Sequence, residues 1–229
     1  MRLFIAIAAI AGLFALRPQK PSSSYLALGD SYTIGDSVDS NQRYPVQAIH
    51  HLFPDSRLKV IATTGWTTGN LLDALAAADP DTNYGAVSLL IGVNNQYQGR
   101  SREEYGDQFT ALLKAAIRLA GNRPSHVLVL SIPDYSVTPF ARGRDTAPAG
   151  LGPARTNRFI AAQIDSFNAI NRRIAAVYKV NYLDVTAESR KAATDAELIA
   201  ADGLHFSGKE YAIWAELMEP WLLTALSQQ

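Results

Sequence analysis

The chain has 229 residues, enough for one sizeable domain or two small ones, and 48% of them are hydrophobic, which is ample for a packed core. Lys plus Arg and Asp plus Glu each total 21, so the formal net charge is zero. This balance gives no basic excess for binding nucleic acid, and the absence of Cys excludes disulfides and thiolate metal sites.

The first segment combines a positively charged start with an apolar run. Arg2 precedes the uncharged stretch 3–16, and a polar stretch rich in Pro and Ser follows it. The run is shorter than the ~18 residues that span a bilayer, and its arrangement is typical of a secretory signal peptide. We expect residues 1–22 to be a signal peptide plus linker and the protein to be secreted or periplasmic. The alternative is an uncleaved N-terminal anchor, which would be the protein's contact with the membrane.

From Tyr25 onward, predicted strands and helices alternate within one domain, residues 23–229. Short apolar runs predict five buried strands, over 25–28, 58–62, 86–91, 126–132 and 181–185. Amphipathic spacing and capping residues predict helices over 41–53 and 68–78, from Ser101 onward, over 160–177 with Val177 facing the core, and from Ser207 onward. This alternation predicts an α/β fold with a parallel sheet covered by helices on both faces.

One segment does not follow the short-loop rule. Residues 133–158 are rich in Pro, Arg and Gly, and loops longer than about 12–15 residues are uncommon and often functional. We expect this loop to line a substrate pocket, with Tyr135, Phe140 and Leu151 as apolar lining. Its arginines would attract an anionic substrate or simply face solvent; they are Arg142, Arg144, Arg155 and Arg158.

A small hydroxyl residue follows the first predicted strand. Ser31, in Gly29-Asp30-Ser31, would lie just beyond the carboxyl end of that strand, where open α/β sheets bind ligands. A serine acts as a nucleophile only with a base and an oxyanion site. Ser31 is therefore a candidate nucleophile if the rest of the chain supplies both.

The best candidate base is His205, in the loop before the last predicted helix. Asp202 precedes it by three residues, a spacing that brings both side chains to one side of a turn. Asp202 could then hold one ring nitrogen and leave the other to take the proton of Ser31. The alternative is an Asp-Gly turn with His205 on the surface. His50 and His51 lie on the first predicted helix, whereas His126 lies at the opposite end of the sheet and is expected to be structural.

Two residues could bind an oxyanion together with the N–H of Ser31. Gly65 follows the second predicted strand and offers a backbone N–H, and Asn94 follows the third and offers its side-chain amide. A strand-end turn for Gly65 and a turn or cap for Asn94 are the alternatives.

These blocks resemble the SGNH hydrolases, also called the GDSL family, over essentially all of residues 24–226. The blocks are Gly29-Asp30-Ser31, Gly65, Gly92-Val93-Asn94 and Asp202-Gly203-Leu204-His205. The resemblance implies a flavodoxin-like three-layer α/β/α sandwich, a Ser-His-Asp triad, and hydrolysis of esters or thioesters without a cofactor or metal. Two positions depart from the family pattern, since Tyr32 replaces a leucine and Asn95 replaces an aspartate.

We therefore expect a serine esterase acting on a small-molecule, lipid or carbohydrate ester. The candidate substrate contacts are Asp30, Asn95, Tyr135 and Phe140. A carbohydrate O-deacetylase and a lysophospholipase or thioesterase are alternatives that use the same triad, and a non-catalytic binding domain is a third. Glycine-rich phosphate motifs are absent, and the four histidines are too scattered for a zinc site.

Overall fold

A parallel sheet forms the centre of the protein. The computed structural model describes residues 24–143 and 153–227. Its five-stranded sheet has the order β2-β1-β3-β4-β5, and every pairing is parallel. The strands are β1 Ser24–Gly29, β2 Arg57–Ala62, β3 Ala86–Leu90, β4 Val127–Leu130 and β5 Asn181–Leu183. The predicted α/β fold with a parallel sheet is thus confirmed, and this strand order is flavodoxin-like.

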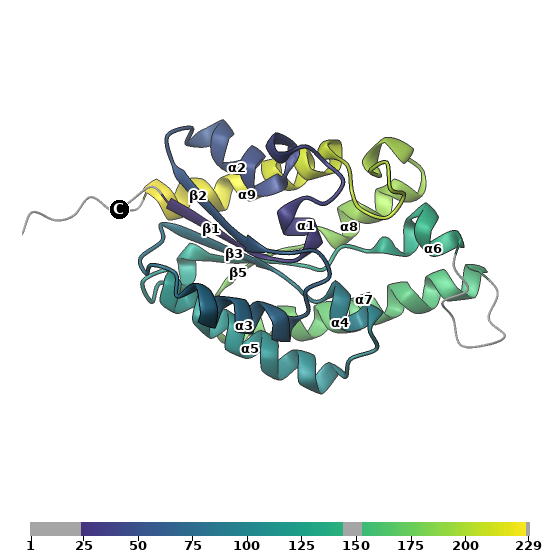
Figure 1. Ribbon diagram of the computed structural model, residues 1–229, viewed down its shortest axis with the longest axis horizontal. Coiled ribbons are helices and arrows are strands. Elements are labelled where there is room, and N and C mark those ends of the chain that lie inside the picture. The colour runs from purple at the N-terminus through teal and green to yellow at the C-terminus, as the bar shows by residue number, and fades with distance from the viewer. Residues whose placement is uncertain (1–23, 144–152, 228–229) are drawn as a thin grey trace, which may run out of the picture.

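Helices cover both faces of the sheet (Figure 1). On one face α2 Tyr44–Leu52 packs against α9 Gly208–Ser227; the other carries α3 Thr68–Ala78, α5 Arg102–Leu119 and α7 Pro153–Val177. Short helices follow the carboxyl ends of the strands: α1 Ser31–Ile34, α4 Val93–Tyr97, α6 Pro139–Gly143 and α8 Thr186–Ser189. The 3-10 turns are η1 Ser40–Gln42, η2 Pro124–His126, η3 Tyr135–Val137, η4 Arg190–Ala193 and η5 Ala196–Leu198.

The position of each strand explains its composition. β1 and β3 lie inside the sheet under both helix layers, and every one of their residues is buried. Strands covered on both faces need mostly apolar side chains, which is why both are rich in hydrophobic residues. The buried hydroxyl of Ser88, in the middle of β3, has a partner in the hydroxyl of Tyr25 at 2.7 Å. The edge strands β2 and β5 keep exposed residues, because they lie at the margins of both layers.

The order of the strands opens a crevice at one edge of the sheet. β1 and β3 are neighbours, whereas the chain passes through β2 between them. The connections that leave β1 and β3 therefore go to opposite faces, toward α2 and α5, and a crevice opens between their carboxyl ends. Gly29 ends β1 there, and a Cβ at this position would lie 2.0 Å from Thr33 Oγ1. The absence of a side chain lets α1 begin directly after the strand.

Three sequence expectations need correction. Residues 133–158 are not one irregular loop, because η3, α6 and the start of α7 lie within them. Val177 does not face the core: it is 70% exposed at the end of α7. The fifth strand ends at Leu183, two residues earlier than expected.

Some expectations concern residues that the structure does not describe. Residues 1–22, the expected signal peptide or anchor, lie outside the described residues, as do Arg144, Leu151 and the side chain of Arg155. Across 24–143 and 153–227, no helix has both the length and the apolar character needed to cross a bilayer.

Candidate active site

Ser31 is the first residue of α1, immediately beyond the end of β1. Asp30 caps this helix, and its Oδ1 accepts a hydrogen bond of 3.1 Å from the N–H of Tyr32. Burial raises the pKa of Asp30 to about 7, against the lowering effect of backbone hydrogen bonds such as that from Tyr32. Because Asp30 is fully buried, it shapes the turn that holds Ser31 and is not the substrate contact expected from the sequence.

His205 and Asp202 are joined by a short hydrogen bond. His205 Nδ1 lies 2.5 Å from Asp202 Oδ2. Asp202 Oδ1 accepts two backbone hydrogen bonds of 2.9 Å, from the N–H groups of Leu204 and His205. These contacts fix the orientation of the ring, and a neutral His205 would carry its proton on Nδ1 and leave Nε2 as the acceptor.

A residue far away in the chain completes the surroundings of Asp202. Ser37, in the segment after α1, donates a hydrogen bond of 2.8 Å from Oγ to Asp202 Oδ2. Partial burial opposes ionisation, but the hydrogen bonds from His205, Leu204 and Ser37 prevail and lower the pKa of Asp202 to about 2. Asp202 is therefore ionised at neutral pH.

Aromatic rings pack against the imidazole of His205. The ring of Tyr32 packs edge to face on His205, with centroids 5.7 Å apart. Tyr32 in turn packs against Phe206, at 5.8 Å, and Trp214, at 6.4 Å. Tyr32 is the residue that departs from the leucine of the family motif, and its position explains the larger side chain: it fills the space under His205.

Ser31, Asn94 and His205 line one cavity of about 170 Å³. They come from the ends of β1 and β3 and from the loop before α9, and the sheet topology brings them together. The rest of the lining is aromatic or aliphatic and consists of Tyr32, Val93, Tyr97, Tyr135, Phe140 and Leu204. Tyr135 and Phe140, predicted from the sequence, thus lie in the cavity wall. Tyr32, Val93, Tyr97 and Leu204 were not predicted.

Asn94 connects the third block to the second. Its Nδ2 donates a hydrogen bond of 3.0 Å to the backbone carbonyl of Trp66, the residue after Gly65. A side-chain amide carries two N–H groups, so the contact with Trp66 leaves one to donate elsewhere. Gly65 is exposed in the turn after β2 with a φ of +83°. Gly65 is not among the residues that line the cavity.

Asn95 faces away from the cavity and is fully buried. Its Oδ1 accepts from Thr68 N–H at 2.9 Å, and its Nδ2 donates to Thr68 Oγ1 at 2.7 Å. Both bonds reach the first residue of α3. Asn95 therefore attaches α4 to α3, and the expectation that it contacts substrate does not agree with its position.

The other histidines lie elsewhere. His126 is buried in η2, and its Nδ1 lies 2.7 Å from the carbonyl oxygen of Gly85, which agrees with a structural role. His50 and His51 lie on α2, and His51 pairs with Glu219 at 2.6 Å. Among the described residues, no group of three or more His, Asp or Glu side chains could hold a metal ion.

A larger hollow on the described part of the chain lies away from these residues. A groove of about 760 Å³ lies between α3 and α5, with Leu72, Leu75 and Leu119 in its lining. None of the expected site residues lines it. Of these two hollows, the smaller cavity is the better candidate site, because only its lining combines a nucleophile, a base and an amide donor.

Comparison with known proteins identifies the family. The sequence pattern of the GDSL-like lipase/acylhydrolase family matches residues 27–213. Comparison with curated proteins gives no match.

Solved structures give the same picture at the level of the fold. Esterase EstA from Pseudoalteromonas sp. is similar with a TM-score of 0.63 and 16% identity, over 90% of this chain and 100% of that one. TesA has a TM-score of 0.64 and 18% identity, over 88% and 99%. Axe2, an acetylxylan esterase from Geobacillus stearothermophilus, has a TM-score of 0.57 and 18% identity, over 92% and 97%.

Proposed function

We propose that this chain, which belongs to the GDSL-like lipase/acylhydrolase family and hydrolyses ester bonds, does so with Ser31 as nucleophile, His205 as base and Asp202 as the orienting carboxylate. The observation that carries the proposal is the cavity lined by both Ser31 and His205, with His205 Nδ1 held at 2.5 Å by Asp202. This arrangement supplies the base that an isolated serine lacks.

The reaction proceeds in two steps. Ser31 Oγ attacks the ester carbonyl while His205 Nε2 takes the hydroxyl proton, and His205 then passes that proton to the departing alcohol oxygen. Water attacks the acyl-enzyme, with His205 again as base, and releases the carboxylic acid and free Ser31. The ionised carboxylate of Asp202 stabilises the imidazolium that forms in each step.

The oxyanion is bound by three donors. The N–H of Ser31, at the first position of α1, has no partner within that helix. Asn94 adds the second N–H of its amide, which the bond to Trp66 does not use. Gly65 does not line the cavity, and we propose its backbone N–H as the third donor because the bond from Asn94 to Trp66 ties the adjacent residue to the site. Donors placed in advance at the developing charge stabilise the transition state more than the ester.

Kinetics of triad variants test this assignment. With p-nitrophenyl acetate, Ser31→Ala and His205→Ala should each lower kcat by about 10³-fold or more, because triad members act as a unit. Asp202→Asn should lower kcat by the same amount or less, since it affects orientation and tautomer. A fluorophosphonate probe should label the wild type at Ser31 and leave Ser31→Ala unlabelled.

The matched control is His50→Gln, on the exposed end of α2, which should keep kcat within a few-fold. Full activity in His205→Ala would remove His205 from the mechanism. A wild type without hydrolysis or labelling would instead favour a non-catalytic binding domain.

The small cavity favours one of the alternative substrates. A volume of about 170 Å³ accepts an acetyl group readily, whereas the long chain of a lysophospholipid or acyl-thioester would extend outside it. A carbohydrate O-deacetylase is therefore the second candidate. Release of acetate from acetylated xylan, compared with hydrolysis of an aryl acetate, distinguishes it from a general esterase.

A further inference from the structure

The wall of the cavity has two parts. Val93 and Tyr97 belong to α4, and Tyr135 belongs to η3. The rings of Tyr97 and Tyr135 meet edge to face, with centroids 6.3 Å apart. These three side chains form one continuous surface, which we call the α4–η3 wall.

The second part of the wall lies beside the base. Phe140 and Leu204 line the cavity together with His205. The N–H of Phe140 donates a hydrogen bond of 2.9 Å to the carbonyl oxygen of Gly203, which attaches α6 to the loop that holds His205. This side of the cavity is therefore built around the imidazole.

The chemistry decides which arm of the ester meets each part. On the proposed function, on which this inference rests, His205 must reach the alcohol oxygen to protonate it as it leaves. The alcohol arm then lies along Phe140 and Leu204. The acyl arm, on the other side of the carbonyl carbon, lies against the α4–η3 wall.

Hydrogen bonds hold Tyr135 in this wall. Its hydroxyl donates to Gln96 Oε1 at 3.0 Å, and Gln96 Nε2 donates to Gln163 Oε1 of α7 at 2.6 Å. Tyr135 is only 5% exposed. The ring is thus fixed at both ends, by the backbone of η3 and by a side chain of α4.

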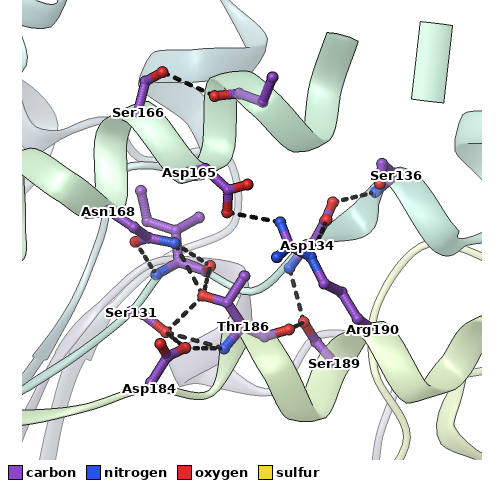
Figure 2. Close-up of polar contacts among 12 residues, drawn as sticks. Ser131, Asp134, Ser136, Asp165, Ser166, Asn168, Asp184, Thr186, Ser189 and Arg190 are labelled. Carbon is purple, nitrogen blue, oxygen red and sulfur yellow. Dashed lines mark hydrogen bonds and ion pairs between the residues drawn. The ribbon is translucent and has the colours of Figure 1, made fainter. Parts of the chain in front are cut away.

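The backbone of η3 has an anchor of its own, seen in Figure 2. Asp134 Oδ1 accepts the N–H of Ser136 at 2.9 Å, and Asp134 Oδ2 pairs with Arg190 Nε at 2.8 Å. Arg190 also pairs with Asp165 of α7 at 2.7 Å. Arg190 of η4 thus holds the buried carboxylate of Asp134 and is itself held by α7, so movement of η3 away from a long substrate would break the contact of a buried charge.

We propose that the α4–η3 wall restricts the enzyme to esters of short acyl groups, of about two to four carbons, and that Tyr135 sets this limit. An apolar cavity of about 150 Å³ holds a molecule the size of benzene. The cavity of about 170 Å³ here must hold the reacting ester group as well as its apolar arm. An octanoyl chain is longer than this cavity and would have to pass the buried ring of Tyr135.

A series of p-nitrophenyl esters with one leaving group and acyl chains from acetate to decanoate tests the proposal. We expect kcat/KM to be highest for acetate or butyrate and at least about tenfold lower for octanoate. Tyr135→Ala should raise the octanoate-to-butyrate ratio by about tenfold or more. Tyr135→Phe, the matched control, keeps the ring and should leave that ratio within about threefold of the wild type.

Two further variants make the result decisive. If Tyr135→Ala does not fold, Tyr97→Ala tests the same wall at a ring that is 47% exposed, and it should shift the ratio in the same direction. Phe140→Ala should change the preference among alcohols of acetate esters and leave the acyl ratio unchanged. A flat chain-length profile, or an unchanged ratio in whichever of Tyr135→Ala and Tyr97→Ala folds, would overturn the proposal.

The same assay separates this inference from the proposed function. Ester hydrolysis with Ser31 labelled but without any chain-length preference would refute the short-acyl wall alone. A wild type that showed neither hydrolysis nor labelling would refute the esterase mechanism, and the inference with it.

Discussion

Asn94 and Asn95 are adjacent in α4 but have different partners. Asn94 shares its amide between the carbonyl of Trp66 and the cavity, whereas Asn95 gives both of its polar atoms to Thr68. We expect Asn94→Ala to lower kcat by about 10²–10³-fold with little change in KM, because an oxyanion donor acts on the transition state. Steady-state kinetics on one aryl ester measure this, with circular dichroism to confirm folding.

Asn95→Ala is the control, and we expect it to lower the stability of the fold more than the catalytic rate. Asn95→Ala leaves the buried N–H of Thr68 without its acceptor, so the free energy of unfolding should fall by about 2 kcal/mol while kcat stays within tenfold. Urea denaturation measures the first quantity. If Asn95→Ala lost more kcat than Asn94→Ala, the assignment of the oxyanion donor to Asn94 would be wrong.

At this scale the sequence identifies residues inside short motifs and misses those defined by distant contacts. Ser31, Asn94 and His205 each lie in a recognisable block, and the structure brings all three to one cavity. Ser37 carries no motif, and its bond to Asp202 spans 165 positions of the chain. The expectation that Asp30 contacts substrate fails for a related reason: adjacency to Ser31 does not determine which side of the turn a side chain occupies.

At the scale of elements, the strands are the best predicted features, because burial on both faces requires a mostly apolar run. The start of α7 was missed because Pro and Gly precede it, although Pro is compatible with the first turn of a helix. Its end at Val177 is confirmed, but the expectation that Val177 faces the core is wrong. The chain turns at Lys179, with a φ of +57°, and the N–H of Val180 bonds to Ala175, so Val180 covers the core instead.

The contact between η3 and η4 gives a prediction about stability. The side chain of Asp134 is 1% exposed and pairs with Arg190, which is 38% exposed. Arg190→Ala leaves a buried carboxylate without its partner, and we expect the free energy of unfolding to fall by about 2 kcal/mol, less than for a fully buried pair because Arg190 is partly in water. Thermal or urea denaturation measures the change.

Two exposed ion pairs of Lys209 serve as the comparison for Arg190. Lys209 lies 3.1 Å from Asp195 and 2.7 Å from Glu197, and all three side chains are largely in solvent. Lys209→Ala should lower stability much less than Arg190→Ala does, because solvent screens exposed charges. Equal effects of the two variants would show that burial of Asp134 does not determine the strength of its contact.

On the scale of the whole molecule, strand order decides where chemistry can occur. The site residues come from sequence positions between 31 and 205, yet they meet at one edge because parallel strands present their carboxyl ends together. Alternation of strands and helices was enough to predict that edge. The size of the cavity was not predictable, since it depends on how α4, η3 and α6 pack against one another.

The stability of the whole protein should depend on pH through two buried carboxyls. Burial raises the pKa of Asp30 and of Glu210 to about 7. Glu210 accepts a hydrogen bond of 2.7 Å from Trp214 Nε1 through Oε1, while its buried Oε2 has no partner among the described residues. In the unfolded chain both groups have pKa values of about 4.

The folded protein therefore holds two protons between about pH 4 and pH 7 that the unfolded chain has released. Their stabilising effect is complete below pH 4 and is lost as the pH rises through 7, so the free energy of unfolding should fall over this interval. Glu210→Gln cannot ionise and should reduce the fall between pH 4.5 and pH 8 by about half. Urea denaturation at several pH values measures this fall in the free energy of unfolding. The control is Glu103→Gln, at an exposed position in the first turn of α5. If Glu210→Gln kept the pH dependence of the wild type, Glu210 would already be ionised in the folded protein at pH 5.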